Sequence, residues 1–162
     1  MKLNLWGRIA VPALLVFLSA IAQAQTVSPI ISEYHGSKAK GEFTVSNGST
    51  GSFHAIILAS SFDVDKDGNP RFRPLDPSIH LRLDSQSNTI GARQAHTYFY
   101  EVTCDKEPCW LSIYAVVGLG RAATPNGGGI NVSVRLPHTV YLCEREKNCR
   151  DHVRRDLWRL AK

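Results

Sequence analysis

Short stretches in which apolar and polar residues alternate are the feature that most constrains the fold of this chain. The clearest is "GINVSVRL" at residues 129–136, where every second residue is apolar. The apolar residues are Ile130, Val132, Val134 and Leu136. Because successive side chains of a strand point to opposite faces, this period of two predicts a β-strand with one apolar face.

Five further segments alternate in the same way or are rich in β-branched and aromatic residues. They are residues 41–47, 53–62, 79–83, 96–104 and 109–117. Clusters of Gly, Pro, Asn, Asp and Ser lie between them, and these residues favour turns. About seven short strands joined by turns predict an all-β fold, an immunoglobulin-like antiparallel β-sandwich.

The first 24 residues have the pattern of a signal peptide. Lys2 and Arg8 supply a positive start, residues 9–22 are mostly apolar, and Ala22 and Ala24 are small residues where a signal peptidase cleaves. We therefore expect residues 1–24 to be removed and the protein to be in the periplasm or secreted. An uncleaved anchor is the alternative, although the apolar run is short for a membrane span. The mature chain has no longer apolar run, so no integral membrane segment is expected there.

The last residues differ in pattern from the rest. In "RDHVRRDLWRLAK", Val153, Leu157 and Leu160 recur at helical spacing, with arginines on the other face. We expect a sandwich domain over residues 25–143 and a basic tail over residues 144–162, forming a short C-terminal helix that caps one end of the sandwich. A basic amphipathic segment resting on a lipid or partner surface is the alternative. Removal of residues 1–24 takes Lys2 and Arg8 with it and lowers the net charge from +5 to a mild +3. The positive charge gathers in this tail, so no nucleic-acid binding is expected.

All four cysteines lie in the part expected to be exported: Cys104, Cys109, Cys143 and Cys149. An even number in an oxidising compartment predicts two disulfides. Three pairings are possible, and we favour the two local ones, because each brackets a turn-like stretch. Such short loops contribute about 2 kcal/mol each in the chain-entropy estimate. Zinc bound by four thiolates is the alternative, but the spacings miss the C-x2-C of most structural zinc sites.

The stretch "DVDKDGNPRFRP" at residues 63–74 resembles a calcium loop, with Asp63, Asp65 and Asp67 at alternate positions. A loop of the EF-hand type requires a bidentate Glu at its twelfth position, which is Pro74 here. Asp67 and Gly68 suit a tight turn. The stretch therefore predicts a connection between two strands.

Motifs for catalysis are lacking in the sequence. The six histidines are scattered, no Ser lies in a G-x-S-x-G elbow, and the only methionine is Met1, so a blue-copper ligand set is incomplete. We expect no enzyme, no catalytic residues, no cofactor and no metal site. A histidine-based metal-binding domain and a structural envelope domain remain alternatives.

The glycine-rich stretch "GLGRAATPNGGG" at residues 118–129 predicts a mobile loop directly before the alternating strand. A loop of this kind beside an alternating strand is typical of a sheet edge that accepts or donates a strand.

The order of segments resembles the N-terminal domain of the periplasmic pilus-assembly chaperones, from about Ser28 to Cys143. The stretch "SPIISEYHGSKAKGEFTVSNGS" is similar to that family's first two strands and the Asn-containing turn after them. "FRPLDPSIHLRL" is similar to the Pro-containing segment before the middle strands, and "GINVSVRLPHTVYL" to the last strand of the domain. The chain is interpreted as a single-domain relative.

The resemblance implies an immunoglobulin-like module that binds exported protein subunits, such as pilin-like ones, by strand addition at its last strand. The residues expected to bind the partner are Ile130, Val132, Val134, Leu136 and His138. The family anchors its client's terminal carboxylate with an Arg on the first strand and a Lys just after the last strand. Here the first position falls near Ile31 and the second near His138.

Overall fold

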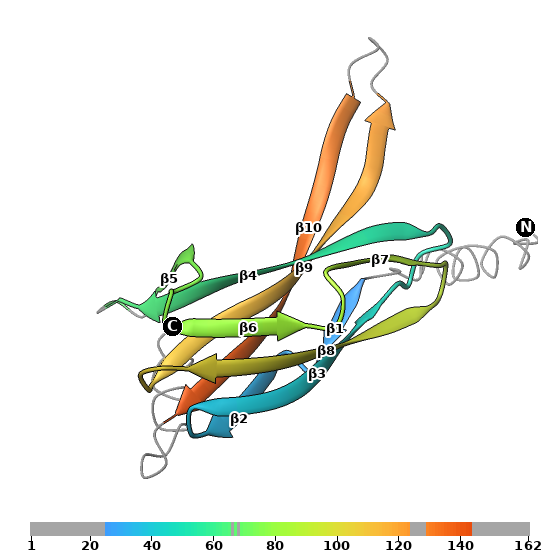
Figure 1. The fold of residues 1–162 in the computed structure, drawn as a ribbon. Helices are drawn as coiled ribbons and strands as arrows, with labels where there is room; N and C mark the ends of the chain where they lie inside the picture. The colour runs from blue at the N-terminus through green and yellow to red at the C-terminus, as the bar shows by residue number, and fades with distance from the viewer. Residues whose placement is uncertain (1–24, 66, 68, 124–128, 144–162) are drawn as a thin grey trace, which may run out of the picture.

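A computed structural model describes residues 25–65, 67, 69–123 and 129–143 of the chain. In these residues ten strands form two sheets that pack face to face (Figure 1). The predicted all-β immunoglobulin-like sandwich is thereby confirmed. The expected signal peptide and the expected C-terminal helix lie outside the described residues. Within the described ranges, no helix has the length and apolar character needed to cross a bilayer.

The smaller sheet has four strands in the order β1, β3, β8, β6, and every neighbouring pair is antiparallel. Their bounds are β1 (Thr26–Ser28), β3 (Lys38–Ser46), β8 (Ala95–Cys104) and β6 (Ile79–Leu83). The alternating segments at residues 41–47, 79–83 and 96–104 lie in these strands, as their periodicity predicts.

The larger sheet has six strands, with β2, β10, β9, β4 and β5 in order and β7 also paired with β4. Their bounds are β2 (Ile31–His35), β10 (Gly129–Cys143), β9 (Cys109–Ala123), β4 (Phe53–Val64), β5 (Pro70–Pro74) and β7 (Ser87–Ile90). The expectation of a purely antiparallel sandwich is wrong for one pair, because β2 runs parallel to β10. Parallel pairing follows from the N-terminal strand changing sheets.

Apolar side chains from both sheets fill the space between them. Phe43 and Tyr98 contribute from the smaller sheet, and Leu111, Ile113 and Val117 from the larger one, all with no exposed surface. Burying a side chain of this size contributes about 1.5–3 kcal/mol. The alternation read from the sequence therefore decides which face of each strand is in the core.

The N-terminal strand crosses from one sheet to the other at Pro29 and Ile30. Before this point β1 pairs with β3 in the smaller sheet, and after it β2 pairs with β10 in the larger one. Pro29 has no backbone N–H and suits a position where ladder pairing is interrupted.

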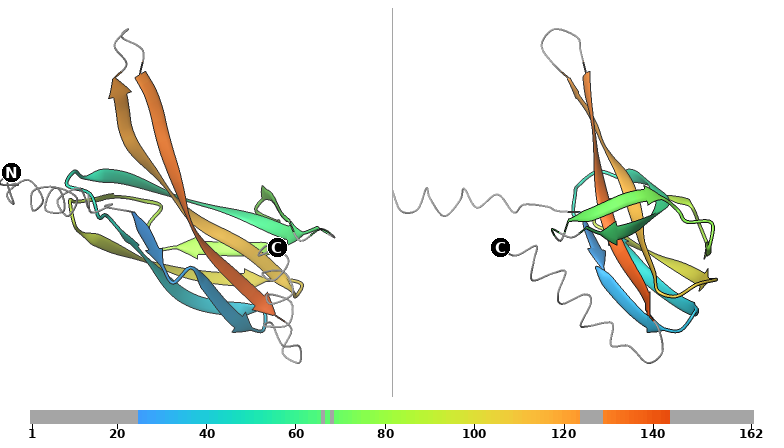
Figure 2. Two further views of the ribbon diagram at one scale, coloured as in Figure 1. Left: turned by 180° about the vertical axis from the view of Figure 1, so that it is seen from behind. Right: turned by 90° about the vertical axis from the view of Figure 1, so that its left-hand side faces the viewer.

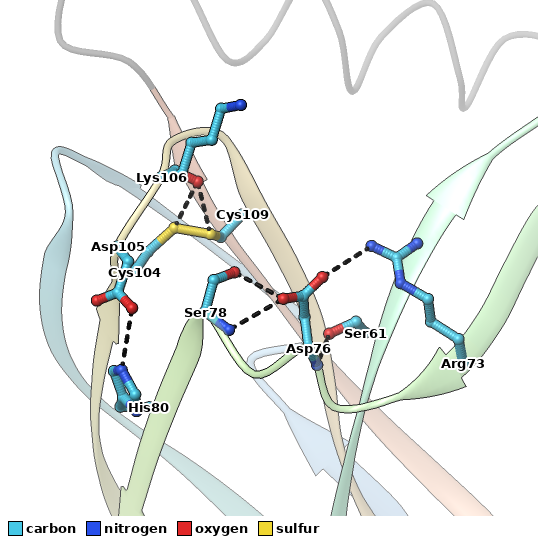
Figure 3. The surroundings of a disulfide bond; sticks show 9 residues. All are labelled: Ser61, Arg73, Asp76, Ser78, His80, Cys104, Asp105, Lys106 and Cys109. Atoms are coloured by element: carbon cyan, nitrogen blue, oxygen red, sulfur yellow. Dashed lines mark hydrogen bonds and ion pairs between the residues drawn. A yellow bond between two sulfur atoms is a disulfide. The ribbon is translucent and has the colours of Figure 1, made fainter.

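The predicted disulfide between Cys104 and Cys109 is confirmed (Figure 3). It is local in sequence, yet it joins the end of β8 to the start of β9 and therefore ties the two sheets together at one end. Cys143 is also disulfide-bonded, and its expected partner Cys149 lies outside the described residues.

A polar cluster lies beside this disulfide (Figure 3). The carboxylate of Asp76 accepts hydrogen bonds from the backbone N–H and hydroxyl of Ser78, at 3.0 and 2.7 Å. The guanidinium of Arg73 lies 3.5 Å from the same carboxylate. These donors lower the pKa of Asp76 below its usual value, the Ser78 backbone N–H most strongly.

The predicted connection at residues 63–74 is a hairpin between β4 and β5. The backbone N–H of Asp65 donates to the Asn69 carbonyl at 3.0 Å, and the Asp65 carboxylate accepts from the N–H groups of Asp67 and Asn69. The aspartates therefore organise a turn. In the part of the chain that the structure describes, no three His, Cys, Asp or Glu residues are grouped as a metal site would require.

Part of the glycine-rich stretch is β-strand. Residues 118–123 continue β9 and pair with the start of β10, so the expectation of a loop over the whole stretch is wrong for this half. Glycine weakens a strand, but pairing with β10 on both sides of a shift in register keeps these residues in strand β9.

Candidate functional site

One edge of the larger sheet is only half covered. Strand β9 pairs with β10 along residues 129–142, whereas β2 pairs with it only along Thr139–Cys143. Among the described residues, no strand pairs with residues 129–138 on the side away from β9. β1 comes close to β10 but pairs with β3. The larger sheet therefore has an open edge, defined here as residues 129–138 of β10.

The crossing of the N-terminal strand creates this opening. Had the chain before Ile31 continued along β10, it would have covered the edge; instead it turns away at Pro29 to join the smaller sheet. The backbone N–H of Thr139 donates to the Ile30 carbonyl at 2.7 Å, and this is the last hydrogen bond before the open edge.

The backbone groups that face the open edge follow from the hydrogen bonds beside it. Thr139 donates its N–H toward β2, and the Cys143 carbonyl accepts from the N–H of Gly36 at 2.9 Å. Because groups that face one neighbour recur at every second residue, Ser133, Arg135 and Pro137 also face away from β9. Ser133 and Arg135 each offer a free N–H and carbonyl, and Pro137 offers a carbonyl.

Pro137 supports this assignment independently. It lies opposite Tyr114 in the ladder with β9, and a proline in mid-strand is tolerated only where its missing N–H would not serve the ladder. The backbone of Pro137 therefore faces away from β9, as the alternation from Thr139 also indicates.

Side chains along the open edge alternate between the two faces of the sheet. Val134 and Leu136 are partly buried, and Leu136 packs against the core between the sheets. Ser133, Arg135 and Pro137 are exposed on the outer face. The backbone of Ile130 and Val132 also lies in β10, with a shift of register between Asn131 and Ser133. All five residues predicted to bind a partner thus lie in the stretch of β10 that forms this open edge.

The fifth predicted residue, His138, has a different environment. Its side chain is fully buried and stacks on the ring of Phe43 with centroids 5.1 Å apart. Nδ1 lies 2.7 Å from the Pro29 carbonyl, so it carries the proton and donates, and Nε2 then accepts from the Tyr100 hydroxyl at 3.0 Å. The Tyr100 hydroxyl lies 3.1 Å from that of Tyr34. His138 therefore fastens the crossing of the N-terminal strand to β10.

Burial governs the ionisation of this network. Desolvation lowers the pKa of His138, and the hydrogen bond to Pro29 opposes that shift. Desolvation and the neighbouring Tyr34 hydroxyl raise the pKa of Tyr100. Both groups are therefore neutral near pH 7, and His138 offers no fixed positive charge to a carboxylate.

Gly41 leaves the space in which the two tyrosines meet. A methyl group at this position would overlap the hydroxyls of Tyr34 and Tyr100. Sequence reasoning did not identify Gly41, Tyr34 or Tyr100, because their contact joins residues far apart in the chain. An isolated glycine within the alternating segment at residues 41–47 was the only signal, since it often marks a close approach in a strand.

The far end of the open edge projects from the sandwich. β4 pairs with β9 only as far as Val117, so residues 118–123 of β9 and 129–133 of β10 have no other strand beside them in the described chain. Figures 1 and 2 show this hairpin extending beyond both sheets. The edge is therefore approachable from the side and along its length.

A hollow of about 560 Å³ lies on the outer face next to the open edge. Tyr114, Arg135 and Pro137 line the side nearest β10, and Phe72 and Arg73 of β5 line the opposite side. The hollow and the edge share two residues, so an added strand would pass along its border.

No family model and no curated protein matches the sequence. Solved structures of pilus chaperones share the fold at low sequence identity. The class 5 fimbriae chaperone CfaA has 12% identity and a TM-score of 0.53, and the match covers 77% of this chain and 58% of CfaA. A chain in the complex of the Salmonella enterica SafA pilin with the SafB chaperone has 9% identity and a TM-score of 0.56, covering 77% and 56%.

A third match is to a chaperone–tip adhesin complex of CFA/I fimbriae, with 12% identity, a TM-score of 0.55 and coverage of 77% and 58%. This chain thus spans less than three fifths of the length of these solved chains. The predicted resemblance to the immunoglobulin-like domain of pilus chaperones is confirmed at the level of the fold.

Proposed function

We propose that this protein binds an exported protein partner by adding one of the partner's strands to the open edge of β10. The observation that supports this most directly is the half-covered edge. β2 begins at Ile31, and among the described residues only β9 pairs with residues 129–138. An uncovered row of N–H and C=O groups is a template for another strand.

The energetics favour a peptide segment as the ligand. Each main-chain hydrogen bond contributes about 0.5–1.5 kcal/mol net. The edge offers two alternate residues, Ser133 and Arg135, whose N–H and carbonyl both face away from β9. On the inner face, the partly buried Val134 and Leu136 have apolar surface left to cover. Main-chain bonds thus supply affinity, and alternate side chains supply specificity.

We propose exported subunits such as pilin-like proteins as the partner class. Residues 1–24 would direct export, residues 25–143 would form the binding domain in the periplasm or outside the cell, and residues 144–162 would form the basic tail. The matched structures include a chaperone in complex with a pilin. The protein acts here by binding, without catalysis.

The residues of the site have two roles in this proposal. Ile130, Val132, Val134 and Leu136 would pack against apolar side chains of the added strand. His138 would act from the interior, by holding Pro29 and thereby fixing where β2 ends and the open edge begins.

The test compares the edge with an apolar residue elsewhere on the same sheet. Val134→Asp is expected to reduce capture of co-exported proteins more than about tenfold, because an added strand would bury the new charge. Ile56→Asp is the matched control, since Ile56 is 45% exposed on β4, away from β10. Thermal unfolding establishes that both variants are folded.

Hydrogen exchange adds a readout at single residues. The amides of Ser133 and Arg135 are expected to exchange fast in the free protein and to become protected in the complex, while the amide of Val134, bonded to β9, is slow in both states. Unchanged capture by folded Val134→Asp, with no new protection at Ser133 and Arg135, would contradict strand addition at this edge.

A further inference from the structure

Arg135 occupies an unusual place on the open edge. Its backbone N–H and carbonyl face the free side, its side chain is exposed on the outer face, and its guanidinium lies 5.2 Å from the centroid of the Tyr114 ring. Stacking on an aromatic face favours the cation without using its N–H donors. The guanidinium is therefore oriented and still able to bind a carboxylate.

Arginines on the opposite edge of the same sheet have carboxylate partners within the chain. Arg71 lies 3.4 Å from Asp65, and Arg73 lies 2.8 Å from Asp63 and 3.5 Å from Asp76. Among the described residues, no carboxylate lies within ion-pair distance of Arg135. The hollow beside it adds no free acid, since its other charged residue is Arg73. In the part of the chain that the structure describes, the positive charge of Arg135 thus has no carboxylate partner.

Strand addition would place a side chain of the partner next to this charge. Directly opposite residues of paired strands point to the same face, with Cβ atoms about 4.5–5.5 Å apart, whichever way the added strand runs. The residue opposite Arg135 therefore lies on the outer face, at the border of the hollow. Its neighbours along the added strand point inward, toward Val134 and Leu136.

We propose that Arg135 selects partner strands with Asp or Glu at the outward position opposite it, between inward-facing apolar residues. The proposal rests on strand addition at β10 and specifies the chemistry of the segment that is added. Opposite charges across a strand pair contribute modestly and like charges oppose pairing, so Arg135 selects among apolar strands more than it drives binding.

The test uses three synthetic peptides of about nine residues, long enough to pair with the open edge. Each alternates Val at inward positions with Thr at outward positions, except for a central outward Glu, Gln or Lys. Acetylated and amidated ends remove the terminal charges. Fluorescence anisotropy measures the affinity of each peptide for the wild type, Arg135→Gln and Arg135→Glu. Arg82→Glu, on β6 of the other sheet, makes the same change in net charge away from the edge.

The wild type is expected to bind the Glu peptide about three- to tenfold more tightly than the Lys peptide. Arg135→Gln should abolish this difference, Arg135→Glu should reverse it, and Arg82→Glu should keep it. The difference should also shrink between about 50 mM and about 500 mM salt, since exposed charges are screened.

Two other outcomes separate the two proposals. Equal binding of all three peptides by the wild type and Arg135→Glu would overturn charge selection and leave strand addition standing. No binding of any peptide by the wild type, together with no protection of the Ser133 and Arg135 amides, would overturn strand addition and charge selection with it.

Discussion

The two edges of the six-stranded sheet differ in how many hydrogen-bond donors they present. At the β5 edge, the bond from Asp65 N–H to the Asn69 carbonyl shows that odd-numbered residues face β4, so Pro70, Phe72 and Pro74 face outward. Two of these three residues have no N–H. At the β10 edge, both Ser133 and Arg135 offer one, and only Pro137 does not.

Charge and length add to this difference. β5 has five residues, and both of its arginines are paired with aspartates from the same chain. Natural sheets protect their edges with short strands, prolines and charges, and β5 has all three. Within the described residues, the same sheet leaves about ten residues of β10 without a partner strand on the side away from β9. This sequence therefore protects one edge of the sheet against pairing with another strand. The lack of such protection along the described part of β10 suggests that the open edge has a use.

The largest effect is expected where the open edge ends. His138→Ala removes the ring that holds Pro29, leaves the Tyr100 hydroxyl without its acceptor and creates a cavity beside Phe43. We expect the free energy of unfolding to fall by about 2–4 kcal/mol, measured by urea denaturation. Amides of β2 should lose protection with it, which would extend the open edge toward Cys143.

His80→Ala is the matched control for this change. His80 is exposed on β6, and its ring lies 3.2 Å from the carboxylate of Asp105. Because a surface side chain contributes little, its loss should cost less than about 0.5 kcal/mol. Similar small losses for both variants would show that His138 does not fasten the crossing.

A single substitution to proline would make the β10 edge more like the β5 edge. Ser133→Pro removes an N–H that faces outward and leaves the hydrogen bonds with β9 in place. Affinity for the Val/Thr peptide with central Gln should fall about three- to tenfold, the worth of one main-chain hydrogen bond, with little change in stability. Ser133→Ala keeps the N–H and should bind like the wild type. Equal affinities for the two variants would mean that this N–H takes no part.

The reverse change should open the β5 edge. Pro70→Val combined with Pro74→Val restores two outward N–H groups, and we expect a second peptide to bind, at least about tenfold more weakly than at β10, because the strand stays short and keeps its arginines. Isothermal titration calorimetry measures the stoichiometry, which should rise from one peptide toward two. A stoichiometry of one would assign the closure of this edge to length and charge.

Sequence patterns predicted the strands that build the core, and among them β10, which carries the open edge. Residues 129–136 alternate without a break, and that pattern alone places Val134 and Leu136 on one face. Periodicity missed β1, β2, β5 and β7, which are short and lie at edges, where little apolar surface is buried. Of these, only β2 lies in the stretch that resembles the first two strands of the chaperone domain. A total near seven strands was therefore too low.

The open edge itself depends on pairing between distant residues, which periodicity does not encode. Whether β10 is covered is decided by the crossing at Pro29. His138 was expected to bind the partner on the resemblance alone, and a lone histidine in a strand gives no sign of burial. Its partners Pro29, Tyr34 and Tyr100 come from three separate segments. Local pattern thus finds which face a strand buries, and only the fold shows which edge it leaves free.

Lowering the pH should reduce the stability contributed by His138 and that contributed by the aspartates near β5 in different pH ranges. Burial lowers the pKa of His138 below its ordinary value of 6.5, so the unfolded chain binds a proton there before the folded protein does. Asp65 and Asp76, near β5, have pKa values below their ordinary 3.8 because they accept backbone hydrogen bonds. The stability that these carboxylates contribute is lost only as the pH falls below that value.

Between pH 7 and pH 5, therefore, the wild type should lose stability through His138 alone among these three groups. The sign follows from linkage: the unfolded state binds more protons as the pH falls through 6.5, so the free energy of unfolding decreases with it. His138→Gln, which keeps a neutral side chain with a donor and an acceptor, should have a flatter slope of stability against pH, whatever its absolute stability. His54→Gln, an exposed histidine on β4, should keep the wild-type slope. Urea denaturation at intervals across this range measures all three slopes, and equal slopes for the wild type and His138→Gln would mean that the crossing at Pro29 tolerates a charged imidazole.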